Sequence, residues 1–331
     1  MSNLYNLKKG VAQLQDLADG ALAVSMLGAG EGDFYYLNPS HTNASDTGSL
    51  SDKRNNPDRP FATLAAAENA LTANQHDTLV YVAGSSSITL TSALTWDKNY
   101  THFIGVCAPT RTAQRARIFQ LATLTGASPL INITASGCIF SNLYIFQGVD
   151  DATSLINVQV TGGRNFYNNV HFAGGGHATQ AIDGGVSLKL NGAEENTFLN
   201  CTIGVDTIDA ATGMVGILFD DEARRNEFYN SKVRMRAGDA GAAFVEIVDA
   251  TGIDRDTLFK DCQFLNNSAT NMTSGFVIPA GMGAPRKIIL DNCGILGVAA
   301  LDANDRGVLF GNMNAVTGAD ASGGYVELIT A

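Results

Sequence analysis

The feature that most constrains the fold is a six-residue phrase that recurs six times between residues 140 and 295. Each copy has a large apolar residue, any residue, then Asn or Asp, two further residues and a second apolar residue. The Asn/Asp positions are 142, 169, 200, 230, 261 and 292, so successive copies are 27 to 31 residues apart. A period of this size means that one structural unit is stacked on copies of itself.

Each period also contains a second apolar segment, which predicts a second strand. These segments are Leu155–Val158, Val186–Leu190, Val215–Phe219, Phe244–Val248, Phe276–Ile278 and Val308–Phe310. Two or three short strands per roughly 30 residues, separated by Gly and Asn turns, predict one coil of a β-helix rather than the hairpins of a sandwich. Residues 323–330 read as a last strand. Each coil would advance by about 4.8 Å, so equivalent residues form columns along the axis.

Residues 33–84 carry a second signal, which precedes the repeat. Pro60-Phe-Ala-Thr-Leu opens a predicted helix over Phe61–Ala73, and Asp77–Gly84 reads as a strand. This combination resembles the start of proteins of the pectate-lyase-like superfamily. The resemblance implies an all-β, right-handed parallel β-helix whose open end is capped by the helix. It says little about activity, because the superfamily holds lyases, hydrolases, epimerases, viral spikes and decoration proteins.

Three regions follow from these patterns: an N-terminal arm (1–32), an opening segment with the capping helix (33–84) and the β-helix (85–331). In the arm, apolar residues recur at helical spacing and form one stripe, before Gly28 to Gly32 break the helix. A stripe of this size has too little area to fold alone, so we expect the arm to bind a partner or a neighbouring subunit. The expected partner-binding residues are Val11, Leu14, Leu17 and Leu22.

Composition excludes several classes of function. The net charge is −11, which argues against a surface for nucleic acid or an anionic membrane. The longest apolar runs fall short of the roughly 18 residues of a membrane-spanning helix, which predicts a soluble protein.

The five cysteines form no C-x-x-C pair, and three of them directly follow the repeated Asn/Asp. We interpret them as core residues of a protein folded in a reducing cytoplasm.

Two polar columns run through the repeat. The Asn/Asp column interrupts the inward alternation, which indicates a left-handed bend stabilised along the stack: Asn142, Asn169, Asn200, Asn230, Asp261 and Asn292. Five residues before it, the charge alternates in sign: Arg164, Glu195, Arg225, Asp256 and Lys287. The acidic pairs near this column therefore read as rungs of a solvated ion ladder rather than catalytic carboxylates. Catalysis and partner contacts stay open as alternatives.

A search for catalytic chemistry gives no constellation, so we predict a protein that is not an enzyme and needs no cofactor or metal. Two carboxyl groups across a groove would be needed for glycoside hydrolysis, and adjacent residues of one strand point oppositely. The five histidines are scattered, His171 occupies an outward position, and the loops are short. The polar loop with Asn38, Asn43, Asp46 and Asp52 fits either turn chemistry or a cation site.

The sequence therefore favours a structural bacteriophage virion protein, assembled in the host cytoplasm. The expected form is a homotrimeric capsid decoration (cement) protein that contacts the major capsid protein or another virion protein, with no nucleic acid or membrane as partner. One alternative is a tailspike or tail-fibre module that binds host surface polysaccharide, with or without cleaving it. A second is a polysaccharide lyase or hydrolase. An outward column of aromatic rings would favour the tailspike, but the aromatic residues of the repeat mostly point inward.

Overall fold

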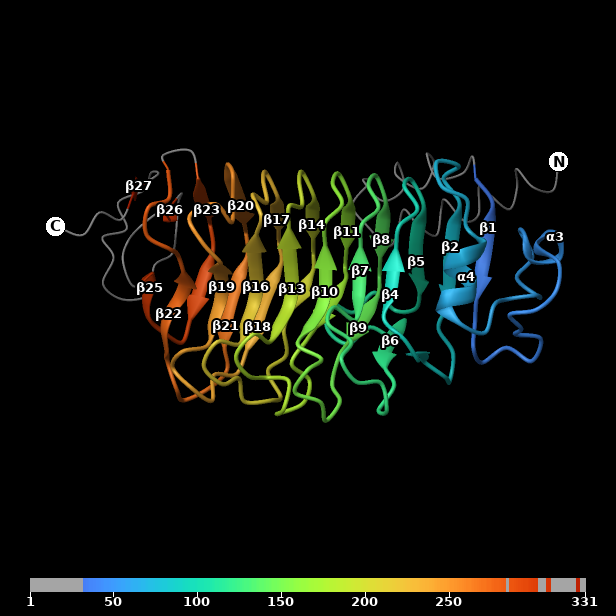
Figure 1. Cartoon of the computed structure of the whole chain (residues 1–331), viewed down its shortest axis with the longest axis horizontal. Helices are drawn as coiled ribbons and strands as arrows, with labels where there is room; N and C mark the ends of the chain where they lie inside the picture. The colour runs from blue at the N-terminus through green and yellow to red at the C-terminus, as the bar shows by residue number, and fades with distance from the viewer. Residues whose placement is uncertain (1–31, 284–285, 303–307, 311–325, 328–331) are drawn as a thin grey trace.

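The computed structural model describes residues 32–283, 286–302, 308–310 and 326–327, the last two segments by their backbone alone. The four expected partner-binding residues of the arm lie outside this part. Figure 1 shows a long, regular stack of coils, with strands of successive coils side by side. This confirms the predicted parallel β-helix. None of the helices described is long and apolar enough to cross a membrane.

Three parallel sheets run along the stack, and each coil visits them in the order A, B, C. Sheet A contains β1 (Phe34–Leu37), β2 (Thr78–Val82), β5 (His102–Val106), β8 (Ile139–Ser141), β11 (Phe166–Asn168), β14 (Thr197–Leu199), β17 (Glu227–Tyr229), β20 (Asp256–Lys260), β23 (Lys287–Asp291), β26 (Val308–Phe310) and β27 (Val326–Glu327). Sheet B contains β3 (Ile88–Leu90), β6 (Arg117–Gln120), β9 (Tyr144–Phe146), β12 (His171–Ala173), β15 (Thr202–Ile203), β18 (Lys232–Met235), β21 (Gln263–Asn266) and β24 (Gly294–Leu296). Sheet C contains β4 (Leu94–Trp96), β7 (Ile131–Ile133), β10 (Ile156–Val160), β13 (Val186–Asn191), β16 (Val215–Asp220), β19 (Ala243–Ile247), β22 (Met272–Val277) and β25 (Val298–Asp302).

The repeated phrase spans the bend from sheet A to sheet B, and the second predicted segments supply sheet C. The prediction for Val308–Phe310 was wrong in one respect, because this segment is β26 of sheet A and the preceding sheet C strand is β25. A short apolar run predicts a strand, but it does not say which of the three sheets the strand joins. The expected last strand is present as β27, which pairs antiparallel with β26.

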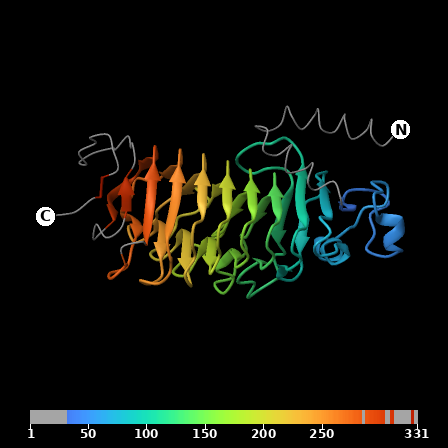
Figure 2. The same ribbon diagram turned by 90° about the horizontal axis from the view of Figure 1, so that it is seen from above.

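The interior is organised as columns of like side chains. Phe140, Tyr167, Phe198, Phe228 and Phe259 stack along sheet A with ring centroids 4.5–5.1 Å apart and planes within 14° of parallel. Each stacked pair adds about 0.5–1.5 kcal/mol beyond the area it buries. The columns therefore hold successive coils in register, which Figure 2 shows as strands in line from end to end.

The opening segment shares the sheet of the solenoid, since β1 pairs with β2 and β2 with β5. The helix α4 (Leu64–Ala70) is shorter than predicted, because the hydroxyl of Thr63 caps it and Phe61 bridges to Leu37 instead. Leu64, Ala67 and Ala70 of α4 are buried in the same core cluster as the solenoid. A second helix, α3 (Leu50–Lys53), is one turn long.

One connection is longer than the sequence led us to expect. Residues 107–115, here called the strap, link β5 to β6 and lie over the A-to-B corner of later coils. The guanidinium group of Arg111 contacts Asn230, 119 residues away, and Gln114 Nε2 donates to the carbonyl oxygen of Asn169 at 2.6 Å. In Figure 2 the strap is the blue-green loop that arches over the stack. The expectation of uniformly short loops was wrong at this position.

Candidate functional site

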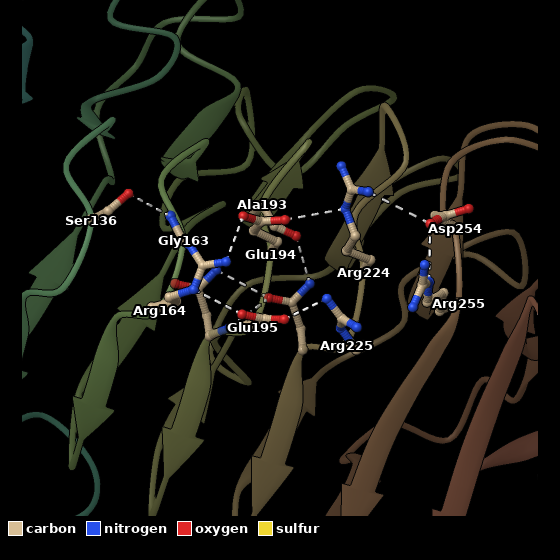
Figure 3. Close-up of polar contacts among 12 residues, drawn as sticks. Ser136, Gly163, Arg164, Ala193, Glu194, Glu195, Arg224, Arg225, Asp254 and Arg255 are labelled. Atoms are coloured by element: carbon tan, nitrogen blue, oxygen red, sulfur yellow. Dashed lines mark hydrogen bonds and ion pairs between the residues drawn. The ribbon is translucent and has the colours of Figure 1, made fainter.

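The densest charged cluster lies where sheet C turns into sheet A, and Figure 3 shows its side chains. Arg164 and Glu195 occupy equivalent bend positions, with φ angles of 57° and 56°. Arg164 Nε lies 2.9 Å from Glu195 Oε2, and the other oxygen of Glu195 pairs with the guanidinium group of Arg225. The structure thus brings together the first three members of the charge column. Asp256 and Lys287 are opposite each other in the register of β20 and β23.

A parallel row of ion pairs runs one or two residues before this column. Glu194 lies 3.2 Å from Arg164 and 3.3 Å from Arg224, and Arg224 continues to Asp254 at 3.7 Å. The carboxylates of Glu194, Glu195 and Asp254 therefore each face at least one guanidinium group, as the dashed lines of Figure 3 show. Their oxygens are therefore engaged in ion pairs, whereas glycoside hydrolysis needs carboxyl groups that are free to reach the substrate.

Behind the charges lies a buried amide column that the sequence analysis missed. Asn165, Asn196 and Asn226 directly follow the charged residues and are at most 1% exposed. Asn196 Oδ1 accepts the backbone N–H of Asn165 at 3.0 Å, and its Nδ2 donates to Asn226 Oδ1 at 3.1 Å and to the Gly162 carbonyl at 3.1 Å. The signal was present, because an Asn follows positions 164, 195 and 225 in the sequence.

The repeated Asn/Asp column occupies the A-to-B bends. All six residues have φ between 46° and 56°, the left-handed region in which Asn is tolerated. The side-chain amide of Asn169 donates to Asn142 at 3.0 Å, Asn230 to Asn200 at 2.8 Å, and Asn292 to Asp261 at 2.6 Å. The same side chains also bond to the strap, since Arg111 donates to Asn230 and Gln114 donates to Asn169.

The cysteines are buried next to this column. Cys201, Cys262 and Cys293 are at most 1% exposed, and their thiols lie 3.3–3.5 Å from backbone carbonyl oxygens of the preceding coil. Burial raises the pKa of the Cys201 thiol to about 12 and also raises that of Cys262. A protonated, buried thiol is a weak nucleophile, so Cys201 and Cys262 suit packing rather than catalysis. The pKa of Cys293 is lowered, chiefly by its hydrogen bond with Cys262.

His171 occupies the outward position expected from the sequence, but it is buried. Its side chain does point away from the core, but the strap covers it, and Ala113 donates its N–H to Nδ1 at 3.1 Å. Nε2 then carries the proton and donates to the Gly204 carbonyl at 2.9 Å. Burial lowers the pKa of His171 to about 4, so the ring is neutral near pH 7.

Two further histidines, scattered in the sequence, meet in space. His76 Nδ1 and His102 Nε2 are 3.2 Å apart, and His102 Nδ1 accepts the N–H of Ile139 at 3.2 Å. Burial lowers the pKa of His102 to about 4. With its ring neutral and both nitrogens bonded, His102 acts as a structural bridge between coils.

The polar opening loop serves as a turn. Asp46 Oδ1 accepts the N–H groups of Ala62 and Thr63, and Oδ2 accepts the Thr63 hydroxyl at 2.8 Å. Asn38 Oδ1 accepts the N–H of Ser40. Within the described part of the chain, no group of three or more His, Cys, Asp or Glu side chains is placed to hold a metal ion.

One carboxyl group on the outer face of sheet C differs from the ion-paired ones. Glu246 of β19 is half-buried between two inward-facing neighbours, Val245 and Ile247. Burial raises its pKa, and the nearby charge of Asp183 raises it further. These residues are 63 positions apart, so no local pattern could have paired them. Glu246 is the described residue whose chemistry best matches a general acid.

Comparisons with known proteins give the fold. No protein-family model and no curated protein matches the sequence. Among solved structures, a pectin methylesterase in complex with a hexasaccharide has a TM-score of 0.55 at 14% identity, over 87% of this chain and 92% of that one. A pectate lyase has a TM-score of 0.46 at 13% identity, over 88% and 80%. The enzymatically active domain of tailspike protein 2 of bacteriophage CBA120 gives 0.41 at 11%, over 84% and 45%.

Proposed function

We propose that this protein is a non-catalytic, structural β-helix of a bacteriophage virion, and more specifically a homotrimeric capsid decoration protein. The observation that carries the proposal is the charge cluster at the C-to-A bends, where Glu194, Glu195 and Asp254 each face a guanidinium group. The acidic net charge and the buried free thiols support a particle assembled in the host cytoplasm. The arm would anchor the subunit to the major capsid protein or to another virion protein.

Deleting residues 1–32 tests the anchoring role. We expect the shortened protein to keep the far-ultraviolet circular dichroism of a β-helix and to lose binding to purified particles in a sedimentation assay. A full-length variant with Glu195→Gln serves as the matched control, because it alters the charge cluster and leaves the arm intact. Undiminished particle binding by the shortened protein would contradict the anchoring role.

Incubation with capsular and pectic polysaccharides tests the absence of catalysis. We expect neither reducing ends nor unsaturated products above the level of a heat-inactivated sample. Glu246→Gln is the informative variant, because Glu246 is the best candidate for a general acid. Turnover by the wild-type protein that disappears in Glu246→Gln would replace the structural proposal with an enzyme.

A second candidate function, binding of host surface polysaccharide, has one observation in its favour. Phe119 and Phe146 are register partners on the outer face of sheet B, each half-buried, while Ile118 and Ile145 point inward. A carbon placed on Gly148 would lie 2.3 Å from the Phe146 ring, so this glycine lets the ring lie flat on the surface. Aromatic faces of this kind can stack on sugar rings. Calorimetric titration with capsular polysaccharide, comparing wild type with Phe146→Ala, tests the idea.

A further inference from the structure

The outward residues of sheet A are mostly apolar over its first three strands, with Thr78 and His102 as polar exceptions. Strand alternation places Tyr35, Leu79 and Phe103 in the core, so the residues next to them point outward. Tyr36, Val80 and Ile104 are mutual register partners and form an outward row across β1, β2 and β5. Beyond β5 the row becomes more polar and continues as Ser141, Asn168, Leu199, Tyr229, Lys260 and Asp291.

Burial along this row is greater than an outer face explains. Ile104 is only 7% exposed, although it belongs to neither hydrophobic cluster of the interior. Burial also raises the pKa of Tyr36, the first residue of the row. Thr78 and His102 on the same face are also buried, as is Ser141, the next residue of the row, whereas Val106 at the end of β5 is 51% exposed. The covering therefore extends over the start and middle of these strands and ends before Val106. An apolar segment that lies along the axis would produce this pattern.

The chain enters the described structure at the edge of this face. Gly32 runs close to the backbone of His76, since a carbon added to it would lie 2.3 Å from the His76 carbonyl carbon. Asp33 then donates its N–H to Asp77 at 2.9 Å and pairs with Arg54 at 3.0 Å, which fixes the start of β1. The 31 preceding residues are therefore tethered four positions before Tyr36 in the sequence.

The size of the arm fits the face. Its apolar stripe runs from Val11 to Leu22, and a helix of this length spans about 18 Å. Four neighbouring strands are together about 19 Å wide, so a helix along the axis covers β1 to β8. Gly28, Gly30 and Gly32 give the chain the freedom to turn back onto the sheet.

We propose that the outer face of sheet A over β1, β2 and β5 is the docking site for residues 1–31 of the same chain, which bind through Val11, Leu14, Leu17 and Leu22. The inference is independent of the virion role, because it concerns how this chain covers its own sheet. Under this proposal, the apolar stripe of the arm binds sheet A of its own chain. A partner of the arm would then contact its polar side or would have to displace the stripe.

Photo-crosslinking of the full-length protein tests the proposal. Benzoylphenylalanine in place of Val80 puts the probe in the row, and benzoylphenylalanine in place of Leu258, on the outer face of β20 in the same sheet, is the matched control. We expect irradiation to link position 80, but not 258, to a peptide from residues 1–31, in a product of monomer mass on a denaturing gel. Leu14→Asp combined with Leu17→Asp should lower the yield about tenfold, because two buried leucines are lost.

Other outcomes overturn the proposal in distinguishable ways. A linked product of dimer mass would mean that the face binds the arm of a second copy. Absence of any link to residues 1–31 would mean that this segment does not cover the row. Equal linking from positions 80 and 258 would mean that the arm contacts sheet A without a defined site.

Discussion

The two bends that flank sheet A both require a sharp turn in every coil, but different residues provide the turn and its hydrogen bonds. At the A-to-B bend one residue does both tasks: Asn200, for example, takes the left-handed conformation and bonds its side chain to Asn230. At the C-to-A bend two residues divide them. Glu195 takes the left-handed conformation and pairs with cations in solvent, while Asn196 is buried behind it. The comparison predicts that the inner amide stabilises the fold and that the outer charge contributes little.

The largest effect is expected from Asn196→Ala. This change leaves the N–H of Asn165 and the carbonyl of Gly162 without their partners in the interior, and each such loss costs about 1–3 kcal/mol. We expect the free energy of unfolding to fall by about 4 kcal/mol in urea titrations. A loss no greater than that of Asn200→Ala would break the proposed division of tasks.

Acid should weaken the A-to-B corner through His171. Its pKa in the folded protein is about 4, below the ordinary 6.5, so the unfolded chain takes up the proton first and stability falls as the pH drops from about 6.5 to 4. The full loss is about 3.5 kcal/mol, because each pKa unit corresponds to about 1.4 kcal/mol. Urea titrations at several pH values would measure it.

His171→Gln is the control for this prediction, since Gln can still bond to Ala113 and Gly204 but does not titrate. The variant should show a flatter dependence of stability on pH over the same range. His102, whose pKa is also about 4, would supply the dependence that remains. An unchanged pH profile in His171→Gln would show that the strap does not hold the ring neutral.

A smaller effect is expected from Asn200→Ala. Alanine in the left-handed region costs about 1–2 kcal/mol, and the bond from Asn230 is lost as well. Asn200→Gly separates the two causes, because glycine accepts the conformation and still lacks the amide. Thermal melting should rank wild type above Asn200→Gly and Asn200→Gly above Asn200→Ala. If the two variants melt together, the bend conformation is not what selects Asn at this position.

The sequence predicted those parts of the fold that repeat. The period and the phrase at positions 142 to 292 predicted the coil, the stacked aromatic column and the bend, because each of these features recurs in every coil. It missed features that occur once. The contact between Ala113 and His171 joins residues 58 positions apart, and Arg234 reaches Thr112 over 122 positions. No period encodes such contacts.

Two omissions had other causes. The amide column at Asn165, Asn196 and Asn226 is also encoded in the repeat. The charged residues next to it led to the prediction of an exposed ion ladder, and the buried amides were missed. The effect of the Asp183 charge on the pKa of Glu246 joins residues 63 positions apart, which the strand pattern does not bring together. The candidate site was thus predictable as an array of charges, whereas its buried support and the raised pKa of Glu246 needed the structure.

The smallest effect, and the sharpest test of the division of tasks, is Glu195→Gln. Glu195 pairs with Arg164 and Arg225 but its side chain is 31% exposed, so solvent and salt screen both contacts. Exposed ion pairs contribute about 0–1 kcal/mol, and we expect a loss at the low end of this range. The loss should shrink further when the salt concentration is raised from about 0.05 to 1 M, because the screening length shortens to about 3 Å. Asn196→Ala, in contrast, should cost the same at both salt concentrations, since its partners are buried. A loss in Glu195→Gln that equals that of Asn196→Ala and does not respond to salt would assign the stabilisation of this corner to the outer charges.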